Sequence, residues 1–89
     1  MAQRDAIAAT EYAYTAVFEP AEEGGYVVSF PALPGCLTQG ETLEEARQMA
    51  AEALQGYLEV LIARGRPIPQ ESLSPEPHRE QVRVAVKAA

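Results

Sequence analysis

The 89-residue sequence has few of the side chains on which most catalytic and metal sites depend. It contains one histidine, His78, one cysteine, Cys36, and one aspartate, Asp5. A single cysteine excludes an internal disulfide framework, and a reducing cytoplasm is the simplest compartment for such a chain. Zinc-binding patterns need several closely spaced cysteine and histidine ligands. We therefore expect no metal site and no cofactor.

His78 and Cys36 are poor candidates for catalysis. His78 lies in a proline-rich stretch without an evident partner to orient it, and a general base needs such a partner. Cys36 has Gly35 and Leu37 as neighbours, rather than the cationic or helix-N-terminal setting that produces a reactive thiolate. We expect an exposed histidine, a partly buried core cysteine and no enzymatic activity.

Basic residues are also scarce. Seven lysines and arginines stand against 13 aspartates and glutamates, which gives a formal net charge of −6. Phosphate contacts need clustered lysine and arginine, so nucleic acid is not expected to be the main partner. The acidic balance fits a basic protein partner, and it fits a role in solubility alone equally well.

Long apolar runs are absent as well. Residues 1–11 hold no apolar core like that of a signal peptide, and no run approaches the roughly 18 apolar residues that span a bilayer. We expect no membrane association, a flexible segment over residues 1–11 and one domain over residues 12–89. A domain this small leaves one sheet face wet or covered by a partner, so a homo-oligomer, a dimer or a tetramer, is expected.

Strand signals and one helix signal follow one another along the chain. Apolar and β-branched residues predict four strands, at about 12–18, 26–30, 36–39 and 82–86. Between the third and the fourth, Thr42 and Glu45 form a capping box. Apolar residues at intervals of three and four then predict a helix over about 42–64, with Gly65 as its C′ residue.

This order of elements predicts an α+β two-layer domain, in which the helix packs on one face of a mostly antiparallel sheet. The first two strands are expected to form a hairpin. We expect the last strand to lie beside the first and parallel to it, after a right-handed crossover.

Residues 24–46 contain the densest conformational signals. Pro31 and Pro34 interrupt strand pairing because proline has no N–H group, and Pro34-Gly35 is a strong turn signal. The stretch resembles the HicB-like antitoxin family of UPF0150 type, and the resemblance extends over roughly residues 12–69. It rests mostly on architectural positions: Gly25, Tyr26, Pro31, Leu33, Pro34, Gly35, Cys36, Thr38, Gly40, Thr42, Glu45, Ala46, Gly65, Ile68 and Pro69.

The resemblance implies a partial RNase H-like fold that lacks the acidic metal-binding cluster of true RNase H enzymes. It also implies an antitoxin that binds a small, basic, RNA-cleaving toxin, HicA-like, and blocks its active site. Many family members carry a second, C-terminal DNA-binding domain. This chain ends just after its last predicted strand, so DNA binding and autoregulation are not expected.

The expected contact surface for a partner is the acidic loop of Glu22 and Glu23, together with Tyr26 and the exposed edge of the sheet. Two other functions stay open. One is an orphan, stand-alone HicB-like domain with a structural or oligomeric role. The other is a degenerate RNase H-like nuclease, for which Glu11 and Glu19 near the first strand are the available carboxylates.

Overall fold

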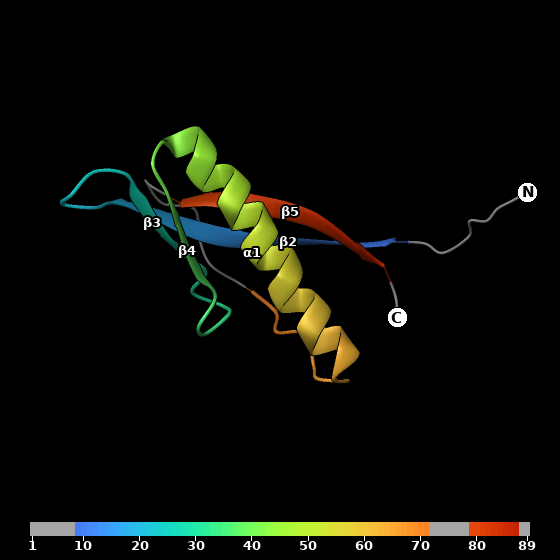
Figure 1. Cartoon of the computed structure of the whole chain (residues 1–89). Coiled ribbons are helices and arrows are strands. Elements are labelled where there is room, and N and C mark those ends of the chain that lie inside the picture. Colours follow the sequence, from blue (N-terminus) through green and yellow to red (C-terminus); the bar gives the residue numbers. More distant parts are fainter. Residues whose placement is uncertain (1–8, 72–78, 88–89) are drawn as a thin grey trace, which may run out of the picture.

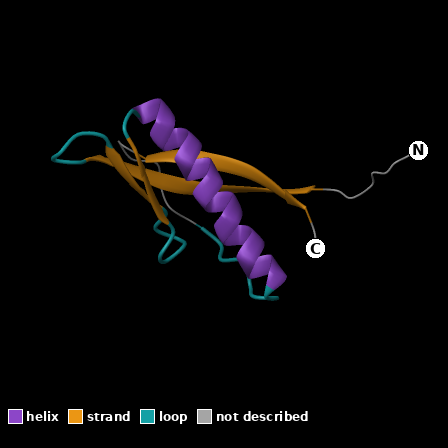
Figure 2. Ribbon diagram, in the orientation of Figure 1, coloured by secondary structure: helices purple, strands orange, loops and turns teal. Residues whose placement is uncertain are grey.

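The computed structural model describes residues 9–71 and 79–87, which form one sheet and one helix. The strands are β2 (Ala9–Pro20), β3 (Tyr26–Ser29), β4 (Leu37–Gly40) and β5 (Arg79–Lys87), and the helix is α1 (Leu43–Ala63). The sheet has the order β4-β3-β2-β5, and α1 lies across one face of it (Figures 1 and 2). The predicted α+β two-layer fold is confirmed.

β2 and β5 are longer than the sequence predicted. They pair over nine residues, from Ala9 opposite Lys87 to Val17 opposite Arg79, and in Figure 1 they run on beyond the short β3 and β4. β2 therefore includes residues 9–11, which were expected to belong to a flexible segment; residues 1–8 lie outside the described residues. Pairing with β5 extends β2 because each added pair satisfies more of the backbone N–H and C=O groups.

The core lies between the sheet and α1. Side chains on one face of β2 alternate into it at Tyr14, Ala16 and Phe18, as the strand period requires. The helix contributes buried residues at intervals of four: Ala46, Ala50, Leu54 and Leu58. Val28 of β3 and Val84 and Val86 of β5 complete the sheet side of this layer. One face of the sheet is thus covered by the helix.

The segment between β3 and β4 folds as two consecutive β-turns, each with a proline at its second position. The Leu33 N–H donates to the Phe30 carbonyl at 2.9 Å, and the Cys36 N–H donates to the Leu33 carbonyl at 3.0 Å. Gly35, at the third position of the second turn, has a φ of 83°, as a type II turn requires. The turns explain the proline and glycine spacing of the sequence.

β4 passes into α1 through a close backbone contact. A Cβ added to Gly40 would lie 2.5 Å from the Ala46 nitrogen and 2.6 Å from its Cα, so only glycine allows this approach. Thr42 is the N-cap, and its Oγ1 accepts from the Glu45 N–H at 3.0 Å. The Glu45 carboxylate reaches back to the Glu41 N–H at 2.6 Å, one residue earlier than in the usual capping box.

The other end of α1 closes as the sequence predicted. Arg64 is the C-cap, and Gly65 follows with a φ of 66°. The Gly65 N–H donates to the Ile62 carbonyl and the Arg66 N–H to the Leu61 carbonyl, which is the Schellman pattern.

The prediction that the last strand runs parallel to the first was wrong. β5 lies beside β2, as expected, but the two strands are antiparallel. The path of the connector after the helix explains this. Tyr14 donates its hydroxyl to the Pro69 carbonyl, and Glu71 contacts the next residue of β2, Thr15. The described residues after the helix therefore run along β2 toward its C-terminal end. β5 begins at that end, with Arg79 opposite Val17, and runs back in the opposite direction.

Glu71 holds this connector against β2 beyond the point where β3 stops. Its carboxylate accepts from the Thr15 N–H at 2.6 Å and from the Thr15 Oγ1 at 2.8 Å. Thr15 is only 6% exposed, so these bonds satisfy polar groups that have little access to water. Burial, the Glu71 charge and Tyr12 raise the pKa of Tyr14, which keeps its hydroxyl protonated as the donor to Pro69.

Candidate functional site

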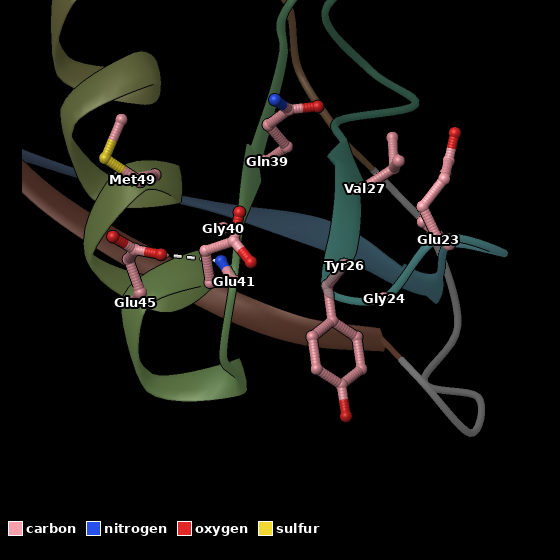
Figure 3. Close-up of a pocket in the computed structure, with 10 residues that line it drawn as sticks. Glu23, Gly24, Tyr26, Val27, Gln39, Gly40, Glu41, Glu45 and Met49 are labelled. Carbon is pink, nitrogen blue, oxygen red and sulfur yellow. Dashed lines mark hydrogen bonds between the residues drawn. The ribbon is translucent and has the colours of Figure 1, made fainter.

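An open hollow of about 710 Å³ lies where β4 passes into α1. Figure 3 shows residues of the helix on one side of β4 and residues of the β2–β3 hairpin on the other. The hollow, called the acidic hollow below, is lined by Ala21, Glu23, Gly24, Tyr26, Val27, Gln39, Gly40, Glu41, Glu45 and Met49.

Strand register and two glycines bring these residues together. β3 pairs with β4 so that Tyr26 lies opposite Gly40 and Val27 opposite Gln39. A Cβ at Gly25 would lie 2.6 Å from the Gly40 carbonyl oxygen, so the hairpin loop can approach the end of β4 only without a side chain there. The loop that carries Glu23 is thereby placed beside the start of the helix.

The hollow is negatively charged. Its lining includes the carboxylates of Glu23, Glu41 and Glu45 and no lysine or arginine. All three glutamates are exposed. Carboxylates accept hydrogen bonds from arginine and lysine, and such charge-assisted bonds are stronger than neutral ones. The arrangement therefore suits a cationic group presented by a partner.

The hollow contains two of the three residues for which the sequence predicted partner contact. Glu23 and Tyr26 line it, whereas Glu22 is exposed in the same loop and is not among the lining residues. Sequence reasoning assigned Glu45 to the capping box and to the family pattern, and it did not assign Glu41, Glu45 or Met49 to partner contact. The pairing of β3 with β4 brings these residues to the same hollow as Glu23 and Tyr26. In the sequence, the capping box directly after the predicted third strand was the one feature that pointed to this position.

The alternative nuclease function lacks a carboxylate cluster among the described residues. Glu11 and Glu19 both belong to β2, and the eight residue steps of extended strand from one to the other span about 27 Å. Glu11 lies 4.0 Å from Arg83 in an exposed ion pair. No group of three or more histidine, cysteine, aspartate or glutamate residues in the described part of the chain could hold a metal ion.

Cys36 is a buried part of the core. Its Sγ donates to the Ala53 carbonyl at 3.8 Å, and burial raises the pKa of the thiol. A thiol with a raised pKa stays protonated and is a weak nucleophile. His78 lies outside the described residues. Within the described part of the chain, no helix is long and apolar enough to cross a membrane.

Comparison with known proteins identifies the family. The sequence profile described as HicB_like antitoxin of bacterial toxin-antitoxin system matches residues 14–84. A UPF0150 protein of Synechocystis sp. is 46% identical over 66 residues, which cover 74% of this chain and 84% of that protein.

Solved structures share the fold. The N-terminal domain of the Burkholderia pseudomallei antitoxin HicB superposes with a TM-score of 0.66 at 23% identity, over 85% of this chain and 99% of that one. One chain of the HicA3 and HicB3 toxin-antitoxin complex superposes with a TM-score of 0.60 at 28% identity, over 72% of this chain and 73% of that one. The chain therefore belongs to the HicB-like antitoxin family, and this membership gives it no enzymatic role.

Proposed function

We propose that this chain is an antitoxin that binds a small, basic, RNA-cleaving toxin of HicA type and blocks its active site. The observation that carries the proposal is the family match over residues 14–84. The likeness to a chain of the HicA3 and HicB3 complex supports a partner of this type. The formal net charge of −6 is complementary to a basic protein.

The acidic hollow is the surface that we assign to the basic side chains of the toxin. Glu23, Glu41 and Tyr26 line the hollow, and Met49 adds a flexible apolar side chain to the lining. Interfaces often combine aromatic and arginine contacts of this kind. Charge complementarity should mainly accelerate association, and this effect should weaken as salt is added.

Co-purification tests the proposed function. The chain is co-expressed with a small basic toxin of HicA type, and both complex formation and growth are measured. A stable complex that restores growth is the expected result. Growth arrest that persists in the presence of this chain, with no complex recovered, would contradict the proposal.

Charge reversal tests the assignment of the hollow. We expect Glu23→Lys combined with Glu41→Lys to slow association with the toxin at least tenfold at low salt and to flatten its salt dependence. Glu19→Lys is the matched control, because Glu19 is equally exposed but lies outside the hollow. Glu22→Lys distinguishes a contact with the hollow from a contact with the whole loop, because Glu22 is in the loop but outside the lining. If Glu22→Lys slows association as much as Glu23→Lys alone, the contact belongs to the whole loop.

We also propose that the uncovered face of the sheet joins copies of this chain in a dimer or tetramer, and that the complex resides in the cytoplasm. Val27, which is 40% exposed and also belongs to the lining of the acidic hollow, is the apolar side chain that favours such a contact. Light scattering of wild type and Val27→Lys tests the assembly: a mass that falls with the substitution is expected, and a monomer at every concentration would contradict it. Cell fractionation tests the location.

A further inference from the structure

A second hollow continues along the same flank of α1 and is mainly apolar. It has a volume of about 330 Å³. Leu37 and Val60, which are 63% and 50% exposed, contribute to its wall. This groove, called the Gly56 groove below, is lined by Gly35, Cys36, Leu37, Glu52, Ala53, Gly56, Tyr57 and Val60.

The groove has a fixed shape. The Tyr57 hydroxyl donates to the Pro34 carbonyl at 2.9 Å and holds one wall against the turn before β4. The Cys36 Sγ donates to the Ala53 carbonyl at 3.8 Å and holds the strand against the helix. A site whose walls are already ordered loses less conformational freedom when a partner binds.

Gly56 has no evident role in folding. It lies inside α1, where glycine is unfavourable compared with alanine. A Cβ built at this position would have no atom within 4 Å, so no close packing explains the absence of a side chain. What the glycine does provide is an open groove.

The groove lies beside an unpaired strand edge. The Phe30 N–H donates to the Cys36 carbonyl at 3.2 Å, so Cys36 directs its carbonyl toward the β3 side. Backbone groups alternate in direction along a strand. Thr38 and Gly40 therefore also face β3, whereas the N–H and C=O groups of Leu37 and Gln39 point away from the sheet. Within the described residues, no strand pairs with this side of β4.

The charge of this flank indicates the partner. Glu52 lines the groove, and the acidic hollow begins at Gln39, two residues along β4 from Leu37. Neither lining contains a lysine or an arginine. The four residues of β4 thus join an apolar groove to an acidic hollow, and a basic segment with an apolar side chain is complementary to both.

We propose that an extended, basic segment of the toxin adds as a strand to the free edge of β4 and places an apolar side chain over Gly56. This inference rests on the proposed antitoxin function. Backbone hydrogen bonds to Leu37 and Gln39 would supply strand addition. The groove would select the apolar side chain, and the carboxylates of the acidic hollow would receive the flanking basic residues.

Amide hydrogen exchange in the toxin complex tests the added strand directly. We expect exchange at the Leu37 and Gln39 amides to slow at least tenfold on binding, because these two N–H groups gain a partner. The Thr38 and Gly40 amides face β3 already and should change much less. Unchanged protection at Leu37 and Gln39 in a formed complex would overturn the proposal.

Substitution of Gly56 tests the groove. We expect Gly56→Leu to weaken toxin binding at least tenfold, since the side chain fills the groove, while its urea midpoint rises above that of wild type because leucine favours the helix. Gly56→Ala should raise the midpoint with a smaller effect on binding. Gln48→Leu is the matched control: it lies on the exposed part of the same helix, outside both linings, and should bind like wild type.

The outcomes are distinguishable. If wild type binds the toxin and Gly56→Leu binds it equally well, the groove assignment is wrong while the proposed function stands. If wild type does not bind the toxin, the proposed function fails and this inference fails with it. If Gly56→Leu instead lowers the mass of the chain alone in light scattering, the occupant is a second copy and the toxin assignment is wrong.

Discussion

The two flanks of α1 meet the sheet in different ways. On the β5 side, Arg47 forms a bidentate ion pair with Glu80, with N–O distances of 2.9 and 2.8 Å, and Val84 and Val86 are buried beneath. On the β4 side, the acidic hollow and the Gly56 groove remain open. On the first flank an ion pair between two side chains joins the helix to the sheet. On the second flank, the close backbone approach at Gly40 does so, together with two side-chain bonds to backbone carbonyls, from Tyr57 and Cys36.

The two flanks of α1 therefore differ in what they can do. The β5 flank is packed with apolar residues and joined by an ion pair, so its contacts stabilise the fold. The β4 flank keeps close contact at Gly40 and leaves space elsewhere. A partner can therefore use the β4 flank without displacing the residues that form the core.

The largest effect is expected where the β4 flank is closely packed. Gly40→Ala would place a Cβ 2.5 Å from the Ala46 backbone nitrogen, and backbone atoms cannot move aside easily. We expect the free energy of unfolding to fall by about 3 kcal/mol, measured by urea denaturation. Gly56→Ala, on the open part of the same flank, is the control and should raise it by up to about 1 kcal/mol. If Gly40→Ala and Gly56→Ala unfold at the same urea concentration, the β4 flank is not both closely packed at Gly40 and open at Gly56.

An intermediate effect is expected from Glu71, which closes the edge of β2 beyond the end of β3. Glu71→Ala removes the acceptor of the Thr15 N–H and hydroxyl. Because Thr15 is buried, we expect a loss of about 1–3 kcal/mol. Glu71→Gln keeps one acceptor oxygen and should lose less, and the exposed Glu22→Ala should change nothing measurable. A Glu71→Ala variant with the stability of wild type would show that water replaces the carboxylate.

The smallest effect is expected from the ion pair on the β5 flank, and it should depend on pH. The hydrogen bond from Arg47 lowers the pKa of Glu80. A lowered folded-state pKa adds stability above the unfolded pKa of about 4.5, and this stability is lost as pH falls through the folded value. Since both side chains are partly exposed, the effect is small.

Thermal unfolding near pH 7 and near pH 3 measures the effect of the ion pair. The melting temperature of wild type should exceed that of Glu80→Gln at the higher pH, and the two melting temperatures should converge at the lower pH. Glu59→Gln is the control, because Glu59 is exposed and its carboxylate accepts from the Gln55 side chain at 3.3 Å rather than from an arginine. If the two melting temperatures differ by the same amount at both pH values, the ion pair with Arg47 is not the cause of the difference.

Most of the fold could be predicted from local signals. Pro31, Pro34 and Gly35 specify turns through their own backbone preferences, and Thr42 and Gly65 specify the ends of α1. The direction of β5 could not be predicted in this way. It depends on the contacts of Pro69 and Glu71 with β2, which join residues more than fifty positions apart.

The candidate site was predictable only in part. Glu23 and Tyr26 belong to one loop and the strand after it, so a local pattern could suggest them together. Glu41 and Glu45 join them only through the pairing of β3 with β4 and the close approach at Gly40. Gly56 carried no signal in the sequence because a helical glycine gains meaning only from the empty space around it. Whether the assigned residues bind a partner stays a prediction.

The burial of Cys36 has a practical consequence. Its Sγ, which is bonded to the Ala53 carbonyl, lies between β4 and the flank of α1 that faces the Gly56 groove. A thiol reagent can reach this sulfur only when the strand and the helix separate locally. Because the chain has a single cysteine, the rate at which a thiol reagent modifies it reports how often β4 and α1 separate locally. A ligand bound in the Gly56 groove should slow this modification.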